Sequence, residues 1–194
     1  MADRNRTPMP SVRGATVLEL LGASALVIAF FGIALPRFDR VAYTLDREAA
    51  SLSLVLESAR NIALNREYPV AVSFEIVPQR LRLHYDLDAD GRVDANEETL
   101  HVPLRPDVAF GTGAAAPLRP RSDPTDFDLL REGRPTVVFS PAGTASESGV
   151  VHLTTRLAAG DESRPSDARA ITIEAHDGSV ECLSYRTRFW EATC

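Results

Sequence analysis

The sequence predicts an α+β protein, with a long N-terminal helix packed on an antiparallel β-sheet or β-sandwich. Three observations lead to this fold class: an apolar run near the N-terminus, a helical period directly after it, and a period of two over most of the remaining chain. The length of 194 residues, with 44% hydrophobic and 25% charged residues, suits one folded domain with an appendage. We therefore expect the helix at 15–65 and a β-rich domain at 66–194.

The apolar run at 15–35 is long enough to cross a membrane once. As a helix it spans about 31 Å, roughly the hydrocarbon core of a bilayer. The residues before it, 1–14, contain three arginines and one aspartate, and basic residues favour the cytoplasmic side of a membrane. We therefore expect a single-pass anchor at 15–35, with a cytoplasmic N-terminus and the β-rich domain on the other side.

Glu19 is the charged residue within this run. A charge at bilayer depth costs about 2.5 to 3.5 kcal/mol on insertion scales, so it needs a partner. Thr16 and Glu19 match the T-x-x-E capping box, in which the acid satisfies amide groups that open a helix. Alternatively, cleavage after Gly14 would leave an α-amine at Ala15, which could pair with Glu19 within one chain or between neighbours. The sequence allows both roles.

The residues at 13–21, Arg-Gly-Ala-Thr-Val-Leu-Glu-Leu-Leu, resemble the class III signal of type IV pilins and type II secretion pseudopilins. In that family a prepilin peptidase cleaves after the glycine, methylates the new N-terminus and requires a glutamate at the fifth mature position. The resemblance implies a leader peptide at 1–14, cleavage and methylation at Gly14 and Ala15, and an assembly role for Glu19. Ala15 departs from the phenylalanine or methionine that is most common at the first mature position.

Pro36 opens or kinks the second half of the helix, because it removes one backbone donor. It also stands at the mature position where many pilins carry a helix-kinking proline. Behind it, apolar residues recur every three or four positions up to about Asn65 and so share one helical face. They are Val41, Leu45, Ala49, Leu52, Leu56, Ala59 and Ala63. We expect this face to lie on the β-rich domain, and the resemblance implies that it also packs into a filament core.

From Tyr68 onward the period changes to two, which predicts antiparallel strands. The strands are expected to begin near Val70, Leu81, Thr99, Thr136, Val150, Ile171 and Val180. Asp177 and Gly178 predict a two-residue hairpin turn between the last two strands. The segments 111–135 and 158–168 are rich in turn-forming or polar residues and are expected to be loops.

The stretch Phe139-Ser-Pro-Ala-Gly143 precedes a valine-rich strand, and Ala170-Ile-Thr-Ile and a hairpin through Gly178 and Val180 follow it. These features are similar to the GspH/FimT domain of minor pseudopilins and minor pilins, where a β-sandwich stands on the long helix. The resemblance implies a structural subunit of a type II secretion pseudopilus or a type IV pilus. It also implies an inner-membrane anchor and a periplasmic domain, and three kinds of partner: prepilin peptidase, other pilins or pseudopilins, and the inner-membrane assembly platform. From this resemblance we expect that no cofactor is required.

Two alternative functions stay open. Arg186 and Arg188 alternate with aromatic residues and are candidate contacts for phosphates and single-stranded bases, as in a DNA-binding minor pilin. The net charge of −6 and the neighbours Glu181 and Glu191 argue against nucleic acid as a partner. An uncleaved single-pass protein with a periplasmic binding domain is the second alternative. We expect no enzyme, because the sequence lacks the nucleophile-elbow, zinc-protease and phosphate-loop motifs.

The segment 86–97 matches the template of a calcium-binding loop. The matching residues are Asp86, Asp88, Asp90, Asp94 and Glu97 at positions 1, 3, 5, 9 and 12, Gly91 at position 6, and Arg92 at position 7, which supplies only a backbone carbonyl. However, the flanks alternate as strands, whereas the usual loop joins two helices, and an Asp-rich hairpin tip is also an ordinary solvated turn. The sequence therefore leaves calcium binding and a solvated turn both open.

Cys182 and Cys194 are the two cysteines of the chain. Both fall in the part expected outside the cytoplasm, where disulfides form. A bond between them would close a loop of about 13 residues and stabilise the fold by about 3 kcal/mol in the chain-entropy model. A buried free Cys182 and an intermolecular bond through Cys194 are the alternatives.

Overall fold

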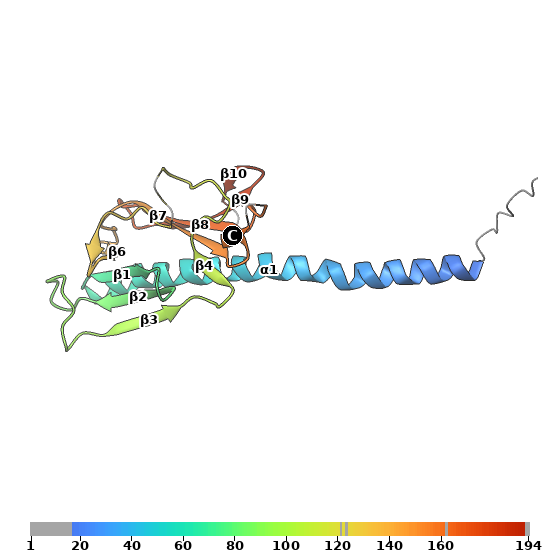
Figure 1. The fold of residues 1–194 in the computed structure, drawn as a ribbon. Helices are drawn as coiled ribbons and strands as arrows, with labels where there is room; N and C mark the ends of the chain where they lie inside the picture. Colours follow the sequence, from blue (N-terminus) through green and yellow to red (C-terminus); the bar gives the residue numbers. More distant parts are fainter. Residues whose placement is uncertain (1–16, 121, 123, 162, 193–194) are drawn as a thin grey trace, which may run out of the picture. The chain divides into compact units, whose positions relative to one another are not determined.

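The computed structural model describes residues 17–120, 122, 124–161 and 163–192 (Figure 1). The chain divides into two compact units, Met1–Arg40 and Val41–Cys194. Helix α1 (Val17–Arg66) belongs to the first unit up to Arg40 and to the second unit from Val41. Within the described residues, α1 is followed by two antiparallel sheets, and the predicted α+β class is confirmed.

The strands of the first sheet lie in the order β3-β2-β1-β6-β5. Their bounds are β1 (Val70–Glu75), β2 (Arg80–Tyr85), β3 (Thr99–Pro103), β5 (Leu130–Arg131) and β6 (Arg134–Phe139). Strand β1 pairs with β2 along its whole length, from Val70 opposite Tyr85 to Glu75 opposite Arg80. In this sheet β2 and β3 therefore lie on one side of β1, and β6 and β5 lie on the other.

The second sheet has the order β10-β9-β8-β7-β4. Its strands are β4 (Val108–Phe110), β7 (Gly149–Thr155), β8 (Ala168–Ile173), β9 (Val180–Arg186) and β10 (Phe189–Glu191), and the 3₁₀ turn η1 (Ala158–Gly160) lies between β7 and β8. All pairings in this sheet are antiparallel. The meander from β7 to β10 thus follows chain order, and β4 is added at its edge.

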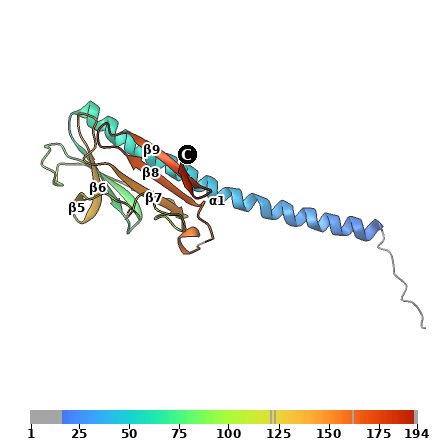
Figure 2. The ribbon, with the colours of Figure 1, turned by 90° about the horizontal axis from the view of Figure 1, so that it is seen from above.

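The apolar face predicted for the helix forms part of the core. The side chain of Val41 lies outside the description, and the other six residues are buried, with exposed fractions of 3% or less: Leu45, Ala49, Leu52, Leu56, Ala59 and Ala63. They join one hydrophobic cluster with residues of both sheets, including Val72, Val137 and Ile171. Figures 1 and 2 show the strands gathered along this part of α1. The helix from Leu45 to Ala63 is therefore an integral part of the β-rich unit.

Aromatic rings connect the loops to the core. The rings of Phe74 and Phe127 stack with centroids 5.1 Å apart, and Phe110 meets Phe74 edge-on at 6.2 Å. Gly149 lies so close to Phe127 that a Cβ there would stand 2.3 Å from the ring. The glycine is required because it lets β7 pass directly beneath this ring.

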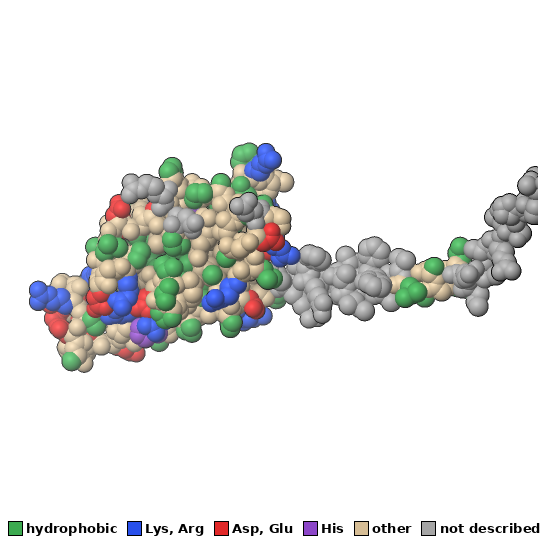
Figure 3. Space-filling view, viewed as in Figure 1, with side chains coloured by type: hydrophobic (Ala, Val, Ile, Leu, Met, Phe, Trp, Pro, Cys, Tyr) green, Lys and Arg blue, Asp and Glu red, His purple; other side chains and the backbone are tan. Residues whose placement is uncertain are grey.

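Ion pairs link the strands of the first sheet. Glu75 is 3% exposed, contacts its register partner Arg80 on β2, and lies 2.9 Å from the guanidinium of Arg134 on β6. Glu132 lies 2.6 Å from Arg82 and 2.5 Å from Arg134. Figure 3 shows basic and acidic side chains next to one another on this face. Ion pairs therefore link β1 to β2 and β6, and link β2 to the turn between β5 and β6.

Every predicted strand is present, with small shifts in where each begins. The two-residue turn predicted at Asp177 and Gly178 is wrong. Strands β8 and β9 do pair, up to Ile173 opposite Val180, and residues 174–179 connect them. Within this connection the Glu174 N–H donates to Ser179 O, and the Gly178 N–H donates to Glu174 O. The predicted loop at 111–135 contains the short strand β5, which exists through its pairing with β6.

Within the described part of the chain, no helix combines the length and the apolar character expected of a membrane-spanning segment. The anchor predicted at 15–35 begins at Ala15, which lies outside the described residues. That anchor stays a prediction.

Candidate functional site

The Asp-rich segment forms the connection between β2 and β3, beyond the last rungs of their ladder. The strands pair as far as His84 opposite Thr99, and the Tyr85 N–H donates to Glu98 O at 3.1 Å. The β-ladder therefore closes the base of the loop and brings its first and last residues together. This places template positions 1 and 12, Asp86 and Glu97, side by side.

Asp86 is almost fully buried, with an exposed fraction of 1%. Its Oδ2 accepts the Gly91 N–H at 3.0 Å and lies 3.5 Å from Nη1 of Arg131 on β5. Its Oδ1 is buried and has no hydrogen-bond partner among the described residues. One carboxylate oxygen is thus held by the protein, and the other is left without a donor.

The next part of the loop turns through local hydrogen bonds. The Asp90 N–H donates to Asp88 Oδ1 at 3.2 Å, and the Arg92 N–H donates to Asp90 Oδ1 at 2.7 Å. Gly91 has a φ of 79°, in the left-handed region where glycine is favoured. The sharp bend at template position 6 is therefore present, and Asp88 and Asp90 stand on the exposed rim of the loop.

Glu97 is held from several sides, and its side chain is 1% exposed. Its Oε1 accepts the Leu87 N–H at 2.8 Å, while Oε2 accepts the Asp94 N–H at 3.0 Å and lies 2.7 Å from His84 Nε2. The Asp94 N–H lowers the pKa of Glu97 most, against opposing desolvation, and His84 and Leu87 lower it further, to about 2. Glu97 is therefore an anion at neutral pH.

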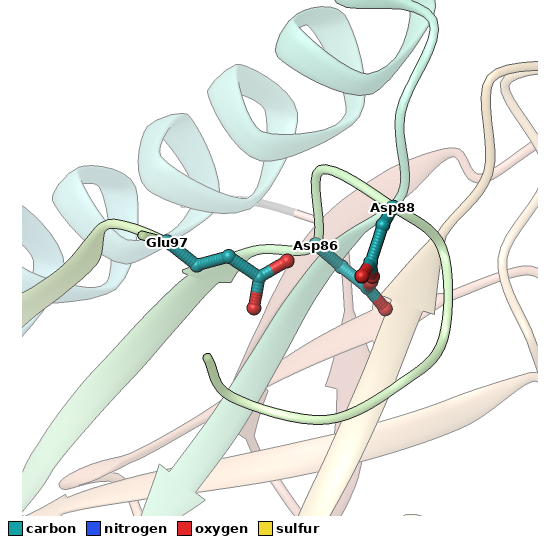
Figure 4. Close-up of side chains that lie close together, drawn as sticks. All are labelled: Asp86, Asp88 and Glu97. Atoms are coloured by element: carbon teal, nitrogen blue, oxygen red, sulfur yellow. The ribbon is translucent and has the colours of Figure 1, made fainter. Parts of the chain in front are cut away.

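Two groups of carboxylates converge in this loop. Asp86, Asp88 and Glu97 each offer an oxygen within 4.8 Å of the others, and Asp88, Asp90 and Asp94 do the same. Figure 4 shows the carboxylates of the first group turned toward one another. The ligands in both groups are carboxylate oxygens, which suit a hard cation such as Ca²⁺. Arg92, at position 7, lines a surface hollow together with Arg131 and Glu132.

The calcium-loop template did not include Arg131 and His84, which contact Asp86 and Glu97. Arg131 comes from β5, and no local pattern places it against Asp86, because the contact depends on how the sheet is ordered. His84 carries a usable signal, since it precedes Asp86 by two positions and residues two apart on a strand share a face. The buried His84 ring, 3% exposed, supports Glu97 from that face.

Of the other predicted site residues, Gly14 and Ala15 lie outside the described part of the chain, and Glu19 lies in α1 with its side chain outside the description. Cys182 is disulfide-bonded. Cys194, the one other cysteine of the sequence, lies outside the described residues. The pairing of these two cysteines stays a prediction.

Arg186 is the last residue of β9, and Arg188 lies in the tight turn between β9 and β10. Both are exposed, and Arg188 has a φ of 81°. Trp190 is packed on the domain, because its Nε1 donates to Ala116 O at 3.0 Å and its ring meets Tyr185 at 5.1 Å. Phe189, 72% exposed, is left as the aromatic ring of this hairpin that faces solvent.

A sequence model for the family described as "Type II transport protein GspH" matches residues 48–176, which is more than half of the chain. The chain belongs to the GspH family. The match includes the end of α1 from Glu48, the Asp-rich loop and the strands up to β8, and it confirms the resemblance inferred from the β-rich part of the sequence.

Two solved structures are similar to this GspH-family chain. The minor pseudopilin EpsH from the type 2 secretion system of Vibrio cholerae has 14% sequence identity and a TM-score of 0.47, covering 72% of this chain and 95% of that chain. The type IV minor pilin FimU of Pseudomonas aeruginosa has 13% identity and a TM-score of 0.46, covering 77% of this chain and 94% of that chain. No curated protein matches this member of the GspH family.

Proposed function

We propose that this chain is a minor pseudopilin or minor pilin, a structural subunit of a type II secretion pseudopilus or a type IV pilus. The observation that carries the proposal is the match to the GspH family over residues 48–176. The prepilin-like signal at 13–21 supports it independently, because it stands outside the matched region. Its partners are then prepilin peptidase, the inner-membrane assembly platform and other pilins or pseudopilins.

In this proposal the peptidase removes residues 1–14 and methylates Ala15. The segment 15–35 anchors the precursor in the inner membrane, with the β-rich unit in the periplasm, until the subunit is extracted into the filament. Glu19 pairs with the α-amine of a neighbouring subunit, which neutralises a charge that is costly within lipid or a filament core.

The outward face of α1 within the second unit offers a surface for neighbouring subunits. Leu54 is 64% exposed and lines a shallow groove together with Ile62. The other residues of this groove are Glu57, Ser58, Asn61, Asn65 and Arg66. A helix with one buried face and a second, partly apolar face can pack on its own domain and on another helix at the same time.

The decisive experiment is the intact mass and N-terminal sequence of the protein isolated from its own membrane, with and without prepilin peptidase. The proposal predicts a peptidase-dependent start at N-methylated Ala15. The variant Gly14→Val should start at Met1 even with the peptidase, whereas Gly22→Ala, a helix glycine with open space around it, should be processed normally.

A start at Met1 in both strains would contradict processing and would favour an uncleaved, membrane-tethered domain. If processing is observed, Glu19→Ala tests assembly: we expect the variant to be cleaved but absent from the filament fraction. Glu181→Ala, which removes an exposed acid on β9, is the matched control and should assemble as the wild type does.

Nucleic acid is not among the partners we propose. The hairpin with Arg186 and Arg188 presents one exposed aromatic ring, since Trp190 packs against Tyr185 and Ala116. Stacking of single-stranded bases uses several exposed rings along a basic groove. The net charge of −6 also disfavours a polyanion.

A further inference from the structure

We propose that the loop at 86–97 binds a calcium ion through the carboxylates of Asp86, Asp88 and Glu97. This goes beyond the proposed role as a filament subunit and does not depend on it. Asp90 and the backbone carbonyl of Arg92, at template positions 5 and 7, are the next ligands in the calcium-loop pattern.

The buried oxygen of Asp86 is the observation that points to a ligand. Asp86 is 1% exposed, and its Oδ1 has no hydrogen-bond partner among the described residues. Leaving a buried carboxylate oxygen without a donor is unfavourable, because the oxygen has lost water and gained nothing in return. A cation within the cluster supplies the missing partner.

The neighbouring contacts leave this oxygen available. Arg131 and the Gly91 N–H both approach Asp86 Oδ2, at 3.5 and 3.0 Å, so they do not occupy Oδ1. Glu97 receives two backbone N–H groups and the His84 ring. A carboxylate has about four lone-pair sites, so Glu97 keeps one for an ion while the protein fixes its position.

The spacing of the oxygens fits calcium. Ca²⁺ binds oxygen at about 2.3 to 2.6 Å, so two ligands of one ion are at most about 5 Å apart. One carboxylate oxygen from each of Asp86, Asp88 and Glu97 lies within 4.8 Å of the other two. The second group, Asp88, Asp90 and Asp94, is exposed throughout. We therefore place the ion with the first group.

The chemistry of the ligand set favours calcium over other divalent metals. Zinc prefers thiolate and imidazole ligands, and here the one imidazole nearby, His84, is engaged with Glu97. Magnesium requires a tight octahedral shell and keeps several waters, whereas calcium accepts irregular shells of carboxylates and carbonyls. A bound ion would tie the end of β2 to the start of β3 and so stabilise this connection.

The test is calorimetric titration of the full chain, purified in detergent, with CaCl₂ and separately with MgCl₂. We expect calcium binding with a Kd of roughly 10⁻⁴ to 10⁻³ M, the range of extracellular calcium modules. Calcium should also raise Tm, and chelation should reverse the rise. Magnesium should bind at least about tenfold more weakly, because the loop does not offer a compact octahedral set.

Variants locate the site. Asp88→Asn, on the exposed rim, should weaken calcium binding at least about tenfold while the protein stays folded, and Asp86→Asn should do the same if it folds. Asp107→Asn removes an exposed aspartate between β3 and β4 and is the matched control. The proposal is overturned if the wild type gives neither heat nor a rise in Tm up to about 10 mM calcium, well above the weakest Kd of this class. It is also overturned if Asp88→Asn binds calcium as tightly as Asp107→Asn does.

Discussion

Glu132 lies between two arginines of the first sheet, and their charges set its protonation. Arg82 lowers the pKa of Glu132 most and Arg134 adds to this, so that the pKa falls to about 2. Because the pKa in the folded chain is below the ordinary value of 4.5, the carboxylate stabilises the fold above about pH 4.5. This contribution is lost as the pH falls from about 4.5 to 2.

We therefore predict that Glu132→Gln lowers the free energy of unfolding at pH 7 by about 0.5 to 1 kcal/mol, a small value because Glu132 is half exposed and solvent screens its ion pairs. At pH 2 the variant and the wild type should be nearly equal, as measured by urea unfolding at both pH values. Glu57→Gln, an exposed glutamate on α1, is the control and should show no pH-dependent difference. An equal loss at pH 2 and pH 7 would contradict the electrostatic explanation.

At the scale of elements, α1 from Leu45 to Ala63 has two faces with different roles. Leu56 is 0% exposed within the core cluster, whereas Leu54, two residues earlier, is 64% exposed. A leucine side chain on this helix therefore packs against the sheets at position 56 and faces solvent at position 54. This pair separates the packing contribution of the helix from its intrinsic helix propensity.

We predict that Leu56→Ala destabilises the protein by about 2 to 5 kcal/mol, the cost of a cavity in a packed core. Leu54→Ala should change stability by no more than about 0.5 kcal/mol, since it removes exposed surface only. Chemical denaturation of both variants is the measurement. Equal losses would mean that this face of α1 does not pack on the sheets as described.

For the molecule as a whole, the core formed by the described side chains lies within the second unit. The hydrophobic cluster runs from Leu45 on α1 to Ile173 on β8, with Val180 and Cys182 packed against it. The unit Val41–Cys194 thus holds both sheets and the helical face that covers them. A unit with its own core can fold without the residues that precede it.

We predict that a chain beginning at Val41 unfolds cooperatively, with a Tm close to that of the full chain in detergent. A chain beginning at Tyr68 is the control: it lacks the buried face of α1 and should fail to fold, because six buried apolar residues are missing. Thermal unfolding followed by circular dichroism measures both. A non-cooperative transition for the chain beginning at Val41 would show that residues 1–40 are needed for folding.

Features that are encoded in adjacent residues could be predicted from the amino-acid sequence alone. The period of 3.6 predicted the buried face from Leu45 to Ala63, and the period of two predicted β1, β2, β3, β6, β7, β8 and β9. The spacing of acids in 86–97 placed Gly91 at the sharp turn of a calcium-loop template, and the structure has that bend. Such patterns can be read directly because side-chain direction repeats with the local backbone geometry.

Other features depend on how the whole chain packs and could not be predicted from local patterns. The strands β4, β5 and β10 have two or three residues each, too few to show a period, and they exist through pairing with β7, β6 and β9. The order of the sheet brings Arg131 to Asp86 and leaves the other oxygen of that carboxylate without a donor. Packing of Trp190 on Ala116 removes one aromatic ring from the C-terminal hairpin surface. The pairing of β4 with β7 and the contacts of Arg131 with Asp86 and of Trp190 with Ala116 join residues tens of positions apart, so the packing of the whole chain selects them. Strands β5 and β10 pair with nearby residues, but they are too short to show a period.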